Sequence, residues 1–273
     1  MNAEGTRVST SWLALREPAD AAARAPDLVD CLRRELPTTG HLVIHDLGCG
    51  SGAMGRWLAP QLPGPQHWVA HDRDADLLAA AAANLPGPAA NGAAVTVEVK
   101  HSDITRLLRD DLTGATLITA SALLDLLTEE ELSRLIDACA GVGCPVLLTL
   151  SVVGRVRLTP PDPLDGRVDG AFDAHQRRST ERGRLLGPDA AALAADEFAR
   201  LGATVRVRPS PWRLGALRSE LAAEWFTGWV GAACEQQLEL ARETGAYTRR
   251  RLAQARAGQL DVTVEHADML ILP

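Results

Sequence analysis

The residues best suited to chemistry lie in one glycine-rich stretch, residues 45–55, with the sequence HDLGCGSGAMG. Within it Gly48, Gly50 and Gly52 stand at alternate positions, and Asp46 precedes them. Because glycine has no Cβ, such a chain can turn tightly and lie close against a ligand, and the N-terminus of a following helix offers free N–H donors. The stretch therefore predicts a loop that binds a small molecule beside an acidic side chain.

Two kinds of loop fit these spacings. Gly50, Gly52 and Gly55 satisfy the GxGxxG fingerprint of dinucleotide binding, and Asp72 follows at roughly the 20 residues expected for the acid that binds the ribose of NAD. The second kind depends on the residue before the glycines. An acid followed by three glycines at alternate positions resembles motif I of the class I S-adenosylmethionine-dependent methyltransferases, which is the more specific match.

The resemblance continues at the ends of the next three predicted strands. It implies that Asp72 binds the ribose hydroxyls of S-adenosylmethionine and that Asp103 contacts the adenine amino group. Ile104, together with Leu47, would enclose the adenine ring, although Ile104 fits an ordinary core position equally well. Ser121, in the segment TASA after the fourth strand, would line the cofactor cleft.

The chemistry of this cofactor agrees with those residue types. It carries a sulfonium cation, a zwitterionic amino-acid tail, a ribose diol and an adenine, so it needs acceptors for the amine and the diol. Asp46 and Asp72 supply these acceptors, and the alternate glycines supply the loop near the tail. Methyl transfer is an in-line displacement, so positioning supplies most of the catalysis. Residues 119–122 are not of the Asn-Pro-Pro-Tyr type that binds planar amides or amines, which favours other small-molecule acceptors.

Candidates for the acceptor site follow the later strands, because ligands of open α/β sheets bind at the carboxyl ends of the strands. Asp125 is a candidate base or acceptor-binding group, with a helix-start acid as the alternative. His175 titrates closest to neutral pH and is the first candidate for a general base, against an exposed histidine on a charged loop. Seven arginines between Arg155 and Arg184 could hold an anionic acceptor, although interleaved aspartates equally favour a solvated face.

These residues need a scaffold, and the pattern from residue 41 onward predicts one. Short apolar runs alternate with alanine-rich helical stretches, which is typical of βα units in a parallel sheet. The fold class is therefore α/β, a seven-stranded, mostly parallel, Rossmann-like methyltransferase sheet with helices on both faces. The predicted strands span residues 41–47, 67–71, 94–101, 116–120, 145–151, 204–208 and 260–266 with 269–272; the predicted helices span 54–61, 75–85, 104–109, 129–140, 189–201, 215–233 and 236–257.

An N-terminal helical segment is expected over residues 1–40, before the sheet. Pro18 and Pro26 each suit the first turn of a helix there. Residues 12–18 could cap the cofactor, with Arg16 on its carboxylate.

The methyltransferase domain itself is expected over residues 41–273, with inserts at about 154–185 and 212–258. The first insert is rich in proline, glycine and charge and is predicted to be an irregular excursion rather than core. The second lies between strands six and seven and forms a helical cap. Its aromatic residues either make an apolar lid over the acceptor or pack the cap onto the sheet; they are Trp212, Trp225, Phe226 and Trp229.

Composition narrows the classes of partner. The 273 residues carry a formal net charge of −7, so the field of the whole molecule disfavours binding to nucleic acid. Five cysteines without Cys-x-x-Cys spacing predict a reduced, cytoplasmic protein without structural zinc. The sequence shows neither an N-terminal apolar run nor a stretch long enough to span a bilayer, so no membrane partner is expected.

The favoured function is methyl transfer from S-adenosylmethionine to a small-molecule acceptor, such as a natural product or another secondary metabolite. The alternatives are an NAD-dependent oxidoreductase and a catalytically inactive cofactor-binding partner protein. The oxidoreductase would need a Tyr-x-x-x-Lys type of pair, but the single tyrosine, Tyr247, and the single lysine, Lys100, lie far apart in the sequence.

Overall fold

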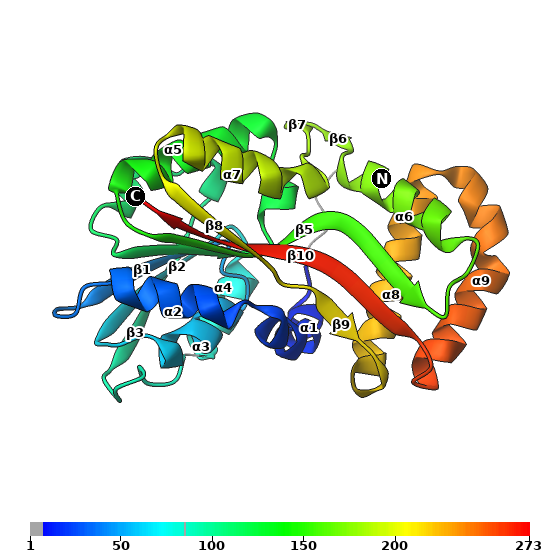
Figure 1. Ribbon diagram of the computed structural model, residues 1–273, viewed down its shortest axis with the longest axis horizontal. Helices are drawn as coiled ribbons and strands as arrows, with labels where there is room; N and C mark the ends of the chain where they lie inside the picture. Colours follow the sequence, from blue (N-terminus) through cyan, green and yellow to red (C-terminus); the bar gives the residue numbers. More distant parts are fainter. Residues whose placement is uncertain (1–7, 85) are drawn as a thin grey trace.

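A mixed β-sheet forms the centre of the protein (Figure 1). The computed structural model describes residues 8–84 and 86–273. The strands of the sheet are β1 (Leu42–Leu47), β2 (Gln66–Asp72), β3 (Val95–His101), β4 (Leu117–Ser121), β5 (Val146–Thr159), β8 (Thr204–Pro209), β9 (Trp212–Leu214) and β10 (Asp261–Leu272). They lie in the order β3-β2-β1-β4-β5-β10-β8, and β9 also pairs with β10. The neighbours from β3 to β5 run parallel, whereas β10 runs antiparallel to β5, β8 and β9. The predicted seven-stranded, mostly parallel sheet is confirmed, with the short β9 added.

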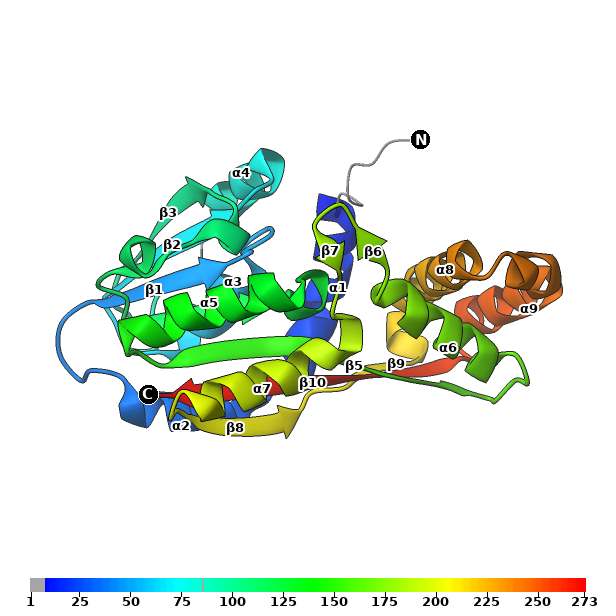
Figure 2. The same ribbon diagram turned by 90° about the horizontal axis from the view of Figure 1, so that it is seen from above.

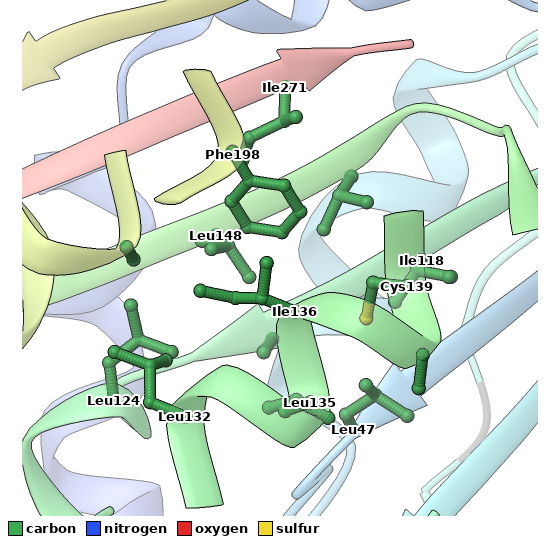
Figure 3. Packing of buried hydrophobic residues seen from close by; sticks show 14 of the residues in the cluster. Leu47, Ile118, Leu124, Leu132, Leu135, Ile136, Cys139, Leu148, Phe198 and Ile271 are labelled. Atoms are coloured by element: carbon green, nitrogen blue, oxygen red, sulfur yellow. The ribbon is translucent and has the colours of Figure 1, made fainter. Parts of the chain in front are cut away.

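Helices cover both faces of this sheet, as predicted. They are α1 (Thr10–Ala23), α2 (Pro26–Glu35), α3 (Ala53–Leu58), α4 (Ala75–Ala83), α5 (Glu129–Val142), α6 (Asp165–Gln176), α7 (Ala190–Arg200), α8 (Ser219–Gln236) and α9 (Leu238–Arg256). On one face, Ile136 of α5 and Phe198 of α7 meet Leu148 and Ile271 of the sheet (Figure 3). On the other face, α2 and α3 bury a second apolar cluster. Each large side chain buried this way stabilises the fold by about 1.5–3 kcal/mol.

The start of α5 shows how local sequence places an element beside the site. Thr128 accepts a hydrogen bond from the Glu131 amide through its hydroxyl at 3.2 Å, and the Glu131 carboxylate accepts one from the Thr128 amide at 3.0 Å. This reciprocal pair is the predicted capping box, and it satisfies amides that the first helical turn leaves unpaired. Gly143, at φ 75°, then ends the helix in a left-handed conformation that favours glycine.

The predicted helix over residues 104–109 is wrong. The chain forms two short 3₁₀ turns instead, Ile104–Arg106 and Arg109–Leu112. The Asp103 carboxylate accepts a hydrogen bond from the Thr105 amide at 3.0 Å, and the Asp111 carboxylate accepts one from the Leu108 amide at 2.9 Å. These side-chain bonds to nearby amides compete with helical hydrogen bonds, so the segment stays in separate turns.

The predicted irregular excursion after the fifth strand is also wrong in its structure. β5 continues to Thr159, because β10 pairs with it as far as Asp261, and α6 follows. Leu158 and Val168 are buried in a third apolar cluster together with residues of α8 and α9. We call the outer parts of β5 and β10, with β9, α6, α8 and α9, the helical lobe; its separation from the main layers of the sheet is visible in Figure 2.

A buried ion pair joins two helices of this lobe. Arg251 of α9 is 1% exposed and donates two hydrogen bonds to Asp165, at 2.8 and 2.6 Å. The Tyr247 hydroxyl donates to the same carboxylate at 2.7 Å. Because Asp165 opens α6, this cluster fixes the first turn of α6 against α9 and leaves the buried guanidinium with a matching anion.

The N-terminal helical segment is present, but Pro18 lies inside α1 rather than in a first turn, whereas Pro26 does begin α2. An interior proline removes one helical hydrogen bond, so α1 depends on its tertiary contacts. Trp12 of α1 contacts Trp212 of β9, with ring centroids 6.4 Å apart. In both ribbon views α1 lies between the main sheet and the helical lobe (Figures 1 and 2).

Candidate functional site

The glycine loop follows β1, where the sequence places it, and its shape requires glycine. Gly48, Gly50 and Gly52 have φ values of 67°, 54° and 83°, in the left-handed region that side chains with a Cβ rarely adopt. Any Cβ added at Gly48 would lie 3.0 Å from Leu123, and one at Gly50 would lie 3.2 Å from Leu13 of α1. The loop is therefore a tightly turned backbone cradle with apolar side chains close on two sides.

The Asp72 carboxylate, at the end of β2, closes this loop. It accepts a hydrogen bond from the Gly50 amide and another from the Asp74 amide, both at 2.9 Å. The acid predicted to bind a ribose thus lies directly against the glycine loop. These two bonds orient the carboxylate and leave its remaining lone pairs for a ligand.

Arg56 of α3 fastens the loop to the N-terminal helix. Its guanidinium donates to the Ser51 carbonyl at 2.6 Å and to the two Glu17 carboxylate oxygens at 2.7 and 2.6 Å. Glu17 belongs to α1, so a bidentate ion pair holds α1 over the loop beside the Leu13 contact. Residues 12–18, which the sequence analysis expects to cap the cofactor, therefore lie next to the glycine loop.

A row of buried polar residues crosses the sheet at its carboxyl edge. Asp46, Thr119, Thr149 and Asp268 continue the face that carries Leu117, Leu147 and Leu270, since side chains on a strand alternate with a period of two. All four polar residues are at most 2% exposed. The row therefore turns an apolar face into a polar one next to the glycine loop.

Asp46 is the acid of this row nearest the glycines. The Thr119 hydroxyl donates to it at 2.8 Å. Burial raises the pKa of Asp46 to about 6, because the charged form loses its hydration, and the Thr119 bond and the nearby Arg24 oppose this rise. A cationic partner would strongly stabilise the charged form of this buried carboxylate.

Arg24, which follows the last residue of α1, is a member of the site that the sequence did not identify. It is 3% exposed, and its guanidinium lies 4.9 Å from the centre of the Trp57 ring. It donates to the Ser121 hydroxyl at 3.1 Å and to the Thr149 hydroxyl at 3.4 Å. Arg16, the arginine that the sequence suggested, instead pairs with Asp20 at 2.9 Å and stacks over Trp212.

The residues expected to hold adenine directly follow β3. Asp103 follows β3 and accepts hydrogen bonds from the Thr105 amide and the Thr105 hydroxyl, at 3.0 and 2.7 Å. Ile104 is 9% exposed and packs in the core cluster that contains Leu47. Asp103 also lines a surface cavity of about 740 Å³, which Arg182 borders from the hairpin of β6 (Ser179–Thr180) and β7 (Gly183–Arg184).

Asp125 and His175 come from different elements, yet both are close to Arg178. Asp125 lies in a 3₁₀ turn after β4; burial raises its pKa to about 6, opposed by Arg16 and Arg178. His175 lies at the end of α6, not on a loop, and its Nε2 is 3.3 Å from a Glu235 oxygen. Burial and then Arg178 lower the pKa of His175, opposed by Glu235, and this shift favours the neutral imidazole.

Most of the charge cluster between Arg155 and Arg184 is engaged in ion pairs. Arg157 pairs with Glu265, Arg167 with Glu243, Arg177 with Asp189 and Arg182 with Glu131. These contacts support the solvated-face interpretation for four of the seven arginines.

Three of the four aromatic residues singled out in the second insert are buried in the core. Trp212, Phe226 and Trp229 are 3%, 0% and 1% exposed, and Trp225 stacks on Trp229 with ring centroids 5.3 Å apart. A side chain without exposed surface does not reach an acceptor, so the packing alternative holds for these three residues.

Comparison with known proteins agrees with the fold. A family model described as "Methyltransferase domain" matches residues 44–145, and no curated protein matches the chain. Among solved structures, the cyclopropane synthase MmaA2 from Mycobacterium tuberculosis is 15% identical; the match covers 97% of this chain and 94% of that one, with a TM-score of 0.52. An S-adenosylmethionine-dependent methyltransferase from Geobacter sulfurreducens, in complex with S-adenosyl-L-homocysteine, is 16% identical, with 97% and 98% of the chains covered and a TM-score of 0.44. Within the described residues, no helix is both long and apolar enough to cross a membrane.

Proposed function

We propose, from the premise that this chain is a class I, Rossmann-like S-adenosylmethionine-dependent methyltransferase, that it methylates a small-molecule acceptor bound beside Asp125. The observation that carries the proposal is the glycine cradle held between Asp46 and Asp72. Three alternate glycines at positive φ, closed by an acid from the next strand, support this proposal, because Asp72 would accept from a diol and Asp46 from an amine. S-adenosylmethionine has both groups.

The residues fit this cofactor along its length. Asp72 would accept hydrogen bonds from the ribose hydroxyls, and Asp46 would pair with the ammonium of the tail. Gly48, Gly50 and Gly52 would let the backbone approach the ligand, and Ser121 would border the tail from β4. Asp103 and Ile104 would hold the adenine by an acceptor and an apolar surface.

The chain has little covalent chemistry to perform. When bound, S-adenosylmethionine supplies an electrophilic methyl carbon on its sulfonium sulfur. The protein holds the acceptor atom in line with that carbon and excludes water, which lowers the entropic part of the barrier. An acceptor hydroxyl or amine also has to lose a proton, and the Asp125 carboxylate or the His175 imidazole would accept it.

The strand order argues against the NAD-dependent alternative. A dinucleotide-binding Rossmann sheet has the order 3-2-1-4-5-6. Here the antiparallel β10, which follows β8 and β9 in the chain, lies between β5 and β8 in the sheet. The GxGxxG match at Gly50, Gly52 and Gly55 therefore occurs in a sheet of a different topology.

Calorimetric titration tests the cofactor. We expect the purified protein to bind S-adenosylmethionine and S-adenosylhomocysteine and to give no heat with NAD. Binding of NAD without binding of S-adenosylmethionine would overturn the proposal.

A product assay then tests catalysis and the acceptor class. Release of S-adenosylhomocysteine is measured with a panel of small secondary metabolites that carry hydroxyl, amine or carboxylate groups. Turnover with at least one of them is expected. If the wild-type protein binds the cofactor but turns over no member of the panel, the result would instead support the inactive partner protein.

A further inference from the structure

Arg24 carries a buried positive charge, and among the described residues no acid lies within ion-pair distance of it. It caps the C-terminus of α1 and is almost completely buried against the Trp57 ring. Its two hydrogen-bond partners, Ser121 and Thr149, are neutral hydroxyls, and its Nη1 atom has no partner among the described residues. A buried guanidinium is costly without a matched acceptor, so this arrangement points to a ligand.

The acids near Arg24 are already engaged by other donors. Asp268 accepts from the Leu150 and Ala25 amides at 2.7 and 2.8 Å. Asp20 accepts from the Arg16 guanidinium and from the Trp212 indole, both at 2.9 Å. In the part of the chain that the structure describes, none of them lies within ion-pair distance of Arg24. Their charges favour the arginine at longer range, while the buried Nη1 atom stays without a hydrogen-bond acceptor among the described residues.

The backbone beside the two hydroxyls is strained in a way that preserves this geometry. Ala122 and Leu150 have φ values of 51° and 55°, although neither is glycine. Each directly follows one of the hydroxyl residues that hold Arg24, and the Ala122 amide donates to the Thr149 carbonyl at 2.9 Å. Strain of this kind is concentrated at functional sites.

We propose that Arg24 binds the α-carboxylate of the amino-acid tail of the cofactor, with the unpaired Nη1 as the principal donor. The inference rests on the proposed function, because Asp46 on the same polar row would hold the ammonium of that tail. Asp46 of the row and Arg24 beside it carry two buried and opposite charges, which then match the two charges of the zwitterion. A planar guanidinium suits this role because it can present parallel N–H donors to a carboxylate.

The test compares two ligands that differ only in the carboxylate. S-adenosylhomocysteine carries it, and 5′-deoxy-5′-(3-aminopropylthio)adenosine, the decarboxylated analogue, keeps the adenosine, the sulfur and the amine. Calorimetry on the full chain gives the ratio of their Kd values for wild type, Arg24→Met, Arg24→Lys and the control Arg16→Met. Thermal unfolding of each variant checks that it folds.

Wild type should bind S-adenosylhomocysteine about ten- to a hundredfold more tightly than the analogue, as expected for charge-assisted hydrogen bonds. The ratio should fall to within about threefold in Arg24→Met and to an intermediate value in Arg24→Lys, which keeps the charge but loses the fork. It should be unchanged in Arg16→Met. If Arg24→Met does not fold, Arg24→Lys and the wild-type ratio still decide the question.

Two results overturn the inference alone. Either wild type binds both ligands equally, or a folded Arg24 variant shows the same ratio of Kd values as wild type. In either case tight binding of S-adenosylhomocysteine would leave the proposed function intact. Failure of wild type to bind S-adenosylhomocysteine at all would instead contradict the proposed function and the inference with it.

Discussion

Replacement of Asp72 by asparagine tests whether this acid serves a ligand or only the loop. Both carboxylate oxygens accept backbone hydrogen bonds, from Gly50 and Asp74 at 2.9 Å. Asparagine has almost the same shape but keeps one acceptor oxygen, and its NH₂ group would face an N–H donor. The substitution therefore removes one loop hydrogen bond and, if the ribose binds here, one or more ligand hydrogen bonds.

The two losses have different sizes and appear in different measurements. One bond to a partly buried charged acceptor contributes about 1–3 kcal/mol to stability, which corresponds to a fall in Tm of roughly 2–10 °C for a chain of this size. Loss of a ribose hydroxyl bond of the same kind weakens binding of S-adenosylhomocysteine about ten- to a hundredfold. Calorimetric titration well below Tm measures the second effect without the first.

Asp162→Asn provides the matched control. The Asp162 carboxylate also accepts a bond from the amide two residues later, that of Leu164 at 3.0 Å, but it lies in the helical lobe and pairs with Arg250. We expect a comparable or smaller fall in Tm and a Kd for S-adenosylhomocysteine within about twofold of wild type. If Asp72→Asn loses stability but binds the ligand like this control, the ribose site lies elsewhere and our assignment of Asp72 is refuted.

Four further outcomes follow from the structure. Burial raises the pKa of Asp46 to about 6, and only the ionised form pairs with an ammonium, so affinity for S-adenosylhomocysteine should fall up to about tenfold per pH unit below pH 6 and be flat above pH 7. Calorimetric titrations from pH 5 to 8 check this, and Asp46→Asn should show no such slope. The same raised pKa makes the Asp46 contribution to stability fall as pH rises from 3.8 through about 6. The free energy of unfolding in urea, compared between wild type and Asp46→Asn across this pH range, checks this. Trp229→Ala should cost about 3–5 kcal/mol in urea unfolding without changing the KM of an acceptor found in the panel assay, and a raised KM at unchanged stability would revive the lid hypothesis. A double-mutant cycle with Glu17→Gln and Arg56→Met should give a coupling energy of about 1 kcal/mol, whereas a value near zero would show that this ion pair does not hold α1.

The sequence was sufficient for elements whose signals are local. The parallel strands from β1 to β4 follow short apolar runs, and α5 follows a capping box, so their positions agree with the predictions to within one or two residues. The glycine loop belongs to the same class, because positive φ at Gly48, Gly50 and Gly52 is a property that glycine itself makes possible. Such features depend on residues close together in the chain.

The features that the sequence did not indicate depend on distant partners. β5 continues past Ser151 because β10, more than a hundred residues later, supplies a partner strand up to Thr159. Arg24 lies at a helix end with no motif around it, and its hydroxyl partners are 97 and 125 residues away. An arginine in a chain rich in arginine carries no local mark of burial, so only the fold could distinguish Arg24 from Arg16.

The position of Arg24 in turn depends on the helical lobe. Asp20, one helical turn before Arg24, accepts a hydrogen bond from the Trp212 indole across 192 residues of sequence. Trp12 contacts the same indole ring, and α1 contains an interior proline, so these tertiary contacts decide where the helix ends. A change in the packing of β9 is therefore expected to reach the Arg24 guanidinium through α1.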